Sequence, residues 1–150
     1  MIIIKILQIL FIIYYYNKMN ISKKDVITII VSAVVLVGVD FFYLSSTSKF
    51  FNNIVKNIQG KEIQFKMLGA IICYVFLVLG LNYFVLLDKK LGKKEKIFKA
   101  FMLGLIIYGV FESTNLAIFT NWTLDALLLD TLWGSILFSI TTYITIILVK

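Results

Sequence analysis

Four long apolar runs constrain this chain more than any other feature of its sequence. They cover approximately Val26–Leu44, Met67–Leu87, Ile97–Phe119 and Leu124–Val149. Each is close to the roughly 20 helical residues needed to cross a hydrocarbon core about 30 Å thick. Backbone polar groups in lipid need partners within the protein, and the runs lack the alternation of barrel strands, so each is expected to be a helix. The sequence therefore predicts an all-α, polytopic membrane bundle with four transmembrane helices.

Composition supports the membrane class and excludes some chemistry. Of the 150 residues, 61% are hydrophobic and none is His, whereas soluble domains are usually about 45–50% apolar. Without His there is no imidazole ligand or general base. The lone Cys73 excludes an intrachain disulfide and a cysteine metal cluster, and is expected to be a small packing residue. No cofactor is predicted, and any metal stays unidentified.

The lysines predict how the helices are oriented. Ten belong to the side of the two chain ends, and four belong to the other side: Lys18, Lys23, Lys24, Lys89, Lys90, Lys93, Lys94, Lys96, Lys99 and Lys150 against Lys49, Lys56, Lys61 and Lys66. Cytoplasmic loops carry the excess of cations, so both termini are expected in the cytoplasm. The lysines lie between apolar spans, which disfavours a nucleic-acid partner. The expected partner is the lipid bilayer of a bacterial inner membrane or of a viral or host membrane.

Two segments outside the four runs carry predictions of their own. Residues 1–18 are apolar but too short for a comfortable span, so the single domain is expected to cover residues 19–150. Residues Phe50–Ile58 show apolar residues at helical spacing with Asn and Lys on the other face. This pattern is typical of a short amphipathic helix in the first outer connection. It could lie on the membrane surface or pack on the outer ends of the bundle.

Three carboxylates fall inside the predicted spans. At a rise of ~1.5 Å per residue, Asp40 lies about 21 Å above the inner start of its helix and Glu112 about 20 Å above that of the third. Asp130 lies about 9 Å below the outer start of the fourth helix. All three therefore arrive at one level, in the outer third of a core about 30 Å thick.

Helical periodicity also gathers these acids with other polar and small residues. Tyr108, Glu112 and Asn115 share one face of the third helix, and Asp130, Trp133 and Gly134 share one face of the fourth. The candidate pocket is therefore lined by Asp40, Tyr108, Glu112, Asn115, Asp130 and Trp133, with Trp122 at its mouth. Small residues that favour close helix packing are Gly109, Ser113, Ala117 and Gly134. Those on the third helix could equally serve a homo-oligomer interface.

The acids have two interpretations. No Lys inside the spans can pair with them, and a charge near the bilayer centre costs roughly 2.5–3.5 kcal/mol on insertion scales. Some of them are therefore expected to be protonated or to share a cation. One interpretation is protonated, hydrogen-bonded groups that join the helices, and the other is a proton or metal-cation site.

The last two runs also resemble a known family. The string YGVFESTNLA, residues 108–117, is followed by Trp122 and by the Asp-x-x-Trp-Gly of residues 130–134. This pattern is similar to domain of unknown function family 2177, uncharacterised small membrane proteins of bacteria and viruses. Glu112 stands where the family usually has Asp, and Tyr43 stands where the Asp-x-x-Trp-Leu of the first helix has Trp. The resemblance implies a four-helix membrane protein from about residue 19 onward and implies no established activity.

Three functions remain open on the sequence alone. The pocket could bind or transport a cation or a small cationic solute. The polar residues could instead fix helix packing in a structural or accessory protein. A lipid-modifying enzyme with Glu112 and Asp130 as acid and base is less favoured, because no nucleophile motif accompanies them.

Overall fold

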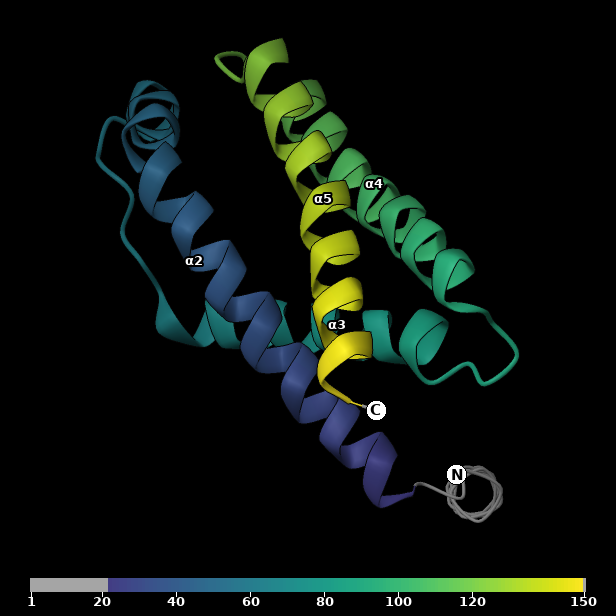
Figure 1. The fold of residues 1–150 in the computed structure, drawn as a ribbon. Coiled ribbons are helices and arrows are strands. Elements are labelled where there is room, and N and C mark those ends of the chain that lie inside the picture. The colour runs from purple at the N-terminus through teal and green to yellow at the C-terminus, as the bar shows by residue number, and fades with distance from the viewer. Residues whose placement is uncertain (1–21, 150) are drawn as a thin grey trace, which may run out of the picture.

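The computed structural model describes residues 22–149, and every regular element among them is helical. The elements are α2 (Lys23–Gln59), α3 (Met67–Leu81) with a π-helical continuation η1 (Asn82–Leu86), α4 (Lys93–Ile118) and α5 (Leu124–Leu148) (Figure 1). Within residues 22–149, four helices are long and apolar enough to cross a membrane. The prediction of an all-α, four-span bundle is confirmed. The segment 1–18 lies outside the described residues.

Local sequence signals explain where the first helix begins and ends. Ser22 and Asp25 form a capping box, in which the Asp25 N–H donates to Ser22 Oγ and the Ser22 N–H donates to Asp25 Oδ2. This arrangement satisfies backbone donors that a helix start leaves free. Gly60 ends the helix with a φ of 73°, a left-handed conformation that glycine adopts without steric cost.

The predicted amphipathic helix is the last part of α2 and is not a separate element. Hydroxyls of Ser45, Ser46, Thr47 and Ser48 bond to carbonyls one turn earlier. Such bonds bend helices, and the last turns of α2 point in a different direction from the rest (Figure 1). Ile54 on this part is buried, whereas Lys56 is exposed. Whether these turns touch a membrane surface stays a prediction.

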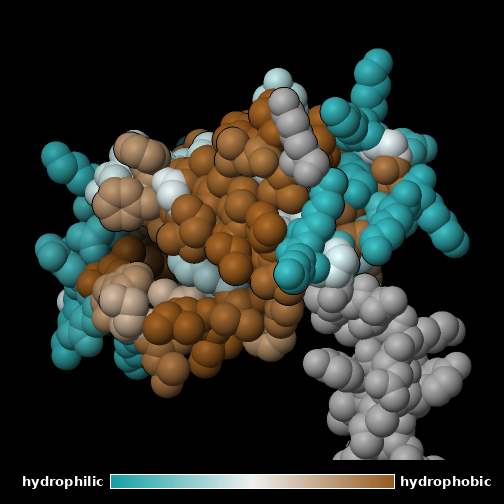
Figure 2. Space-filling view, turned by 60° about the horizontal axis from the view of Figure 1, so that its bottom comes forward, coloured by the Kyte–Doolittle hydropathy of each residue, from teal (hydrophilic) through white to brown (hydrophobic). Residues whose placement is uncertain are grey.

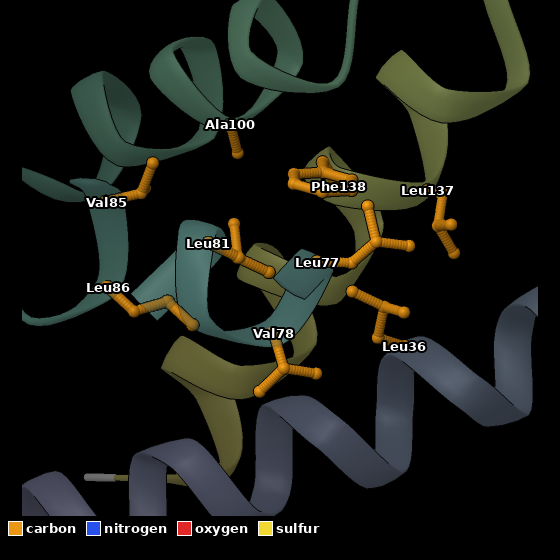
Figure 3. Packing of buried hydrophobic residues seen from close by; sticks show 9 residues of the cluster. All are labelled: Leu36, Leu77, Val78, Leu81, Val85, Leu86, Ala100, Leu137 and Phe138. Atoms are coloured by element: carbon orange, nitrogen blue, oxygen red, sulfur yellow. The ribbon is translucent and has the colours of Figure 1, made fainter. Parts of the chain in front are cut away.

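All four helices contribute to one apolar layer in the middle of the molecule. The cluster consists of Leu36, Leu77, Val78, Leu81, Val85, Leu86, Ala100, Leu137 and Phe138 (Figure 3). Many other large apolar side chains stay exposed, among them Val34 and Phe76, each 69% exposed. Figure 2 shows such side chains as a broad belt between two hydrophilic ends. This distribution suits helices whose outer faces contact lipid rather than water.

The two ends of the bundle differ in the chain segments that meet there. We call one the terminal end, where α2 begins and α5 ends, and the other the loop end, where the α4–α5 connection lies (Figure 1). The apolar layer separates polar groups at these two ends. Which end faces the cytoplasm stays a prediction.

One helix pair owes its contact to two glycines. A Cβ on Gly104 of α4 would collide with the backbone of Gly134 and Ser135 on α5, and a Cβ on Gly134 would collide with the ring of Tyr108. Their missing side chains let the two helices approach closely. This contact fixes α4, which carries Glu112, against α5, which carries Asp130.

Candidate functional site

The three intramembrane acids lie on three different helices near the loop end. Asp40 is on α2, Glu112 on α4 and Asp130 on α5. Asp40 is 6% exposed and Glu112 1% exposed, while Asp130 is partly buried. Burial of three carboxylates requires hydrogen-bond donors, because an unpaired buried acid is costly.

Aromatic side chains supply those donors at Asp40. Tyr74 O–H on α3 donates to Asp40 Oδ2 at 2.7 Å, and Trp133 N–H on α5 donates to Asp40 Oδ1 at 2.8 Å. Both carboxylate oxygens are thus occupied by groups from two other helices. Asp40 therefore joins α2, α3 and α5 through its hydrogen bonds.

The other two acids have a different arrangement. Trp122 N–H donates to Glu112 Oε2 at 2.7 Å, and Tyr43 O–H donates to Asp130 Oδ1 at 2.9 Å. Within residues 22–149 the second oxygen of each carboxylate makes no hydrogen bond that meets ordinary geometric criteria, although the Asn115 side chain lies beside Glu112. One oxygen of Asp130 therefore has no hydrogen-bond partner among these residues, and at Glu112 a ligand would compete only with the Asn115 amide for the second oxygen.

Tyr43 also connects the two arrangements. Its ring stacks on that of Trp133, with ring centroids 4.3 Å apart and an interplanar angle of 8°. Trp133 donates to Asp40, whereas Tyr43 donates to Asp130. The stacked pair therefore holds two carboxylates from two helices in a fixed relation.

A cavity of about 510 Å³ opens between the helices at the loop end. Glu112 and Asp130 both line it, and Asp40 does not. The other lining residues are mostly apolar or aromatic, and the whole set is Leu44, Thr47, Ser48, Lys49, Phe51, Asn52, Ile63, Phe65, Phe111, Glu112, Trp122 and Asp130. Its size is within the range of pockets that hold small molecules.

Within residues 22–149 the acids neither pair with a lysine nor form a metal-binding group. The salt bridges of this part of the chain are Lys56–Glu62 and Lys89–Asp25, and none of their four residues lines the cavity. Lys49 lines the cavity but bonds to neither acid. Among residues 22–149, no three His, Cys, Asp or Glu side chains lie close enough to hold a metal ion. Coordination of one metal ion by all three acids therefore finds no support among the described residues, while the expectation that some of the acids are protonated or share a cation stays a prediction.

The remaining predicted pocket residues divide between the site and the packing. Asn115 is buried one turn from Glu112, and Trp122 is half-buried at the cavity. Tyr108 instead packs against Gly134 and meets the Phe138 ring edge to face at 6.4 Å. Trp133 donates its hydrogen bond to Asp40 and does not line the cavity.

The small residues singled out by the sequence lie in different surroundings within the chain. Gly134 lies in the α4–α5 contact, and Gly109 lies beside Thr131 of α5. Ser113 and Ala117 are exposed, so they do not bring the two helices together within the chain. Periodicity placed Gly109, Ser113 and Ala117 on one stripe of α4, but α5 crosses that stripe only near Gly109.

Sequence reasoning also missed several residues. Gly104, which makes the close α4–α5 approach, could have been found from its position four residues before Tyr108. Tyr43 and Tyr74 are the donors to two of the acids, and Tyr43 is three residues after Asp40. Tyr74 offered no signal, because nothing in an apolar helix tells which of its aromatic residues faces a partner. Cys73 was expected to pack inside and is exposed.

The fold and the polar site define a class of protein. Four apolar helices, a lipid-facing belt and buried polar groups between the helices describe a multi-pass integral membrane protein that sits in a lipid bilayer. The chain belongs to the family described as "Predicted membrane protein (DUF2177)", which matches residues 25–147. This agrees with the resemblance given by the sequence motifs. No curated protein and no solved structure matches the chain.

Proposed function

We propose that this membrane protein binds a small, partly apolar solute that carries an ammonium group, in the cavity at the loop end. Glu112 and Asp130 would accept hydrogen bonds from the ammonium group through their second oxygens. The main support is that a buried carboxylate, Glu112, and a partly buried one, Asp130, line one cavity whose other walls are largely apolar, and that neither pairs with a lysine of the described chain.

The aromatic walls support an organic cation over an inorganic one. Phe51 and Trp122 lie at the cavity with ring centroids 6.5 Å apart, and Phe111 also lines it. Cations bind favourably over aromatic faces, and aromatic groups that surround an ammonium ion are a known recognition mode. A metal ion would instead need several oxygen ligands at short range.

The hydrogen bonds to the acids support the same ligand. Trp122 N–H and Tyr43 O–H are neutral donors, so they stabilise ionised carboxylates without cancelling the negative charge. A ligand cation would supply the missing positive charge. Transport of the solute is a further step that a flux measurement in proteoliposomes would test.

The test is thermal stability of the full chain in detergent, titrated with n-hexylammonium chloride. A ligand that binds only the folded state stabilises it by about 2.7 kcal/mol at a hundredfold excess over Kd. We expect stabilisation by hexylammonium that exceeds stabilisation by hexanol, and none by Mg²⁺ or Ca²⁺. Equal stabilisation by hexanol, or stabilisation by a divalent cation alone, would contradict the proposal.

Variants then locate the effect. Glu112→Gln and Asp130→Asn should each remove the hexylammonium shift and leave a folded bundle. Asp125→Asn is the matched control, because Asp125 is an exposed acid at the start of α5 and does not line the cavity. If Asp125→Asn loses the stabilisation by hexylammonium as fully as the other two variants, the cation acts through the overall charge of the protein. The assignment of the site to Glu112 and Asp130 would then be wrong.

A further inference from the structure

A second cavity, of about 200 Å³, lies at the terminal end of the bundle and differs from the first in charge. It is bounded by the start of α2, the end of η1, the start of α4 and the end of α5. The lining residues are Lys24, Thr28, Leu86, Leu91, Lys93, Lys96, Thr145, Ile146 and Val149. Three of them are cationic and none is acidic.

The central lysine is fixed in place. Lys96 is partly buried, and its Nζ donates to the Leu86 carbonyl oxygen at 2.6 Å. An ammonium group has three donors, so this bond leaves two. Lys24 from α2 and Lys93 from α4 are exposed at the rim of the cavity. Three amines from two helices thus surround one space.

The acids near this end do not line the cavity, although Asp88 is close enough to Lys96 to act on its charge. Asp25 accepts from the Ser22 N–H and pairs with Lys89 at 3.8 Å. Asp88 accepts from the Lys90 N–H at 2.9 Å. The three cavity lysines therefore lack an acidic partner among the salt bridges of residues 22–149.

The excess of lysines at this end does not by itself explain the cavity. A bias in loop charge sets orientation and needs only cations close to the span ends. Lys90, Lys94 and Lys99 satisfy that requirement equally and do not line the cavity. The gathering of the other three around one space is a separate feature of the fold.

The walls of the cavity indicate which anion fits. Leu86, Leu91, Ile146 and Val149 form an apolar side next to the lysines. Leu148, next to Val149 on α5, is 63% exposed and belongs to the surface that lipid would cover. An anionic head with an apolar stem would match both the lysines and these walls.

We propose that this cavity binds the phosphate group of an anionic lipid from the leaflet at the terminal end. Basic pockets between membrane helices commonly bind acidic lipid head groups. The lysines would contact the phosphate oxygens, and the lipid chains would run along the exposed apolar faces beside α5. This inference is independent of the ammonium site, since the two cavities share no lining residue.

The experiment measures lipid binding to the purified full chain by native mass spectrometry, with phosphatidylglycerol as the anionic probe and phosphatidylcholine as the zwitterionic control. We expect phosphatidylglycerol to bind at least tenfold more tightly. Triple replacement of Lys24, Lys93 and Lys96 by Gln should weaken that binding about tenfold, because these amines supply the local positive charge.

The matched control replaces Lys90, Lys94 and Lys99 by Gln. It removes the same charge from the same end of the bundle and should change phosphatidylglycerol binding less than twofold. Equal weakening by both triple variants would overturn the proposal, because binding would then follow net charge and not the cavity.

Two further measurements test whether the ligand is a lipid and whether Lys96 itself is needed. Inorganic phosphate at millimolar concentration should not displace phosphatidylglycerol; if it does so, the ligand is a soluble phosphate and the lipid assignment is wrong. If the triple Gln variant does not fold, Lys96→Gln is measured beside Lys96→Arg. Arg at this position should retain phosphatidylglycerol binding and Gln should lose it, and retention by both would overturn the proposal.

Discussion

The three intramembrane carboxylates lie in two regions with different surroundings. Around Asp40, both oxygens accept hydrogen bonds from side chains of two other helices, and the group lines no cavity. Around Glu112 and Asp130, one oxygen of each acid accepts a bond and both groups line the larger cavity. The difference indicates that acids near the same end of the bundle need not share a role. The first region has the features of helix packing, and the second has those of a ligand site.

The largest expected effect comes from separating α4, which carries Glu112 of the cavity region, from α5. Gly104→Val would force α4 away from Gly134, and overpacking of this kind costs about 3 kcal/mol of unfolding free energy. We expect a large loss of thermal stability in detergent together with loss of hexylammonium binding.

The control for this variant is Gly38→Val on α2, where a Cβ would have nothing within 4 Å. It should leave stability nearly unchanged. A Gly104→Val protein as stable as the wild type would mean that α4 and α5 do not meet at these glycines.

The second prediction concerns only the region around Asp40, where both carboxylate oxygens accept hydrogen bonds. Asp40→Ala would leave the Tyr74 O–H and the Trp133 N–H without an acceptor, which should lower the free energy of unfolding by about 2 kcal/mol. Hexylammonium should still stabilise the variant, because Asp40 does not line the cavity. Loss of hexylammonium binding with unchanged stability would reverse the roles assigned to the two regions.

The third prediction compares two tryptophans by one substitution. Trp122→Phe keeps a ring at the cavity but removes the donor to Glu112, so hexylammonium affinity should fall about fivefold, near 1 kcal/mol. Trp133→Phe removes a donor to Asp40 and should lower stability while leaving that affinity nearly unchanged. The two variants would be measured side by side by ligand titration and thermal denaturation. Equal changes in affinity and stability in the two variants would mean that the region around Asp40 and the cavity region are one functional unit.

The smallest effect is expected at Asn82, the first residue of η1. Asn82 is buried and donates to Ser32 Oγ and to the Val78 carbonyl oxygen, while its own Oδ1 has no partner among the described residues. Hydrogen bonds between membrane helices contribute about 0.6 kcal/mol on average. Asn82→Leu removes these bonds and the unpaired oxygen together, so thermal denaturation should detect a change of no more than about 0.6 kcal/mol. A large loss would show that this region is as important to the fold as the region around Asp40.

Much of the fold could be predicted from the sequence because each signal is local. The four runs, the capping residues Ser22 and Asp25, and Gly60 after the first long helix act within one helix or one turn. Periodicity within α4 likewise brought Glu112 and Asn115 to one buried face. The bend within α2 was missed, because hydroxyl-to-carbonyl bonds at residues 45–48 keep the helix continuous where the change in polarity suggested a separate element.

The candidate site could be predicted only in part. The acids and Trp122 were identified because polar groups are conspicuous in an apolar run. The donors Tyr43 and Tyr74 were not, because aromatic residues also face lipid, as the exposed Tyr83 and Phe76 do. The lysine cavity could not be predicted either, since Lys24 and Lys96 lie 72 positions apart and meet only because α2 and α4 begin beside one another.

The sequence by itself determined that this protein is a four-span helical membrane protein of a recognisable family, because lipid imposes length and apolar character on each span separately. The tertiary structure decided which acid has both oxygens hydrogen-bonded away from the cavity and which acids line it. That distinction depends on donors that arrive from other helices, on the glycine contact that sets α4 against α5, and on how much space their packing leaves. Hydrogen bonds and cavities of this kind join residues distant in the chain, so they exist only once the helices have assembled.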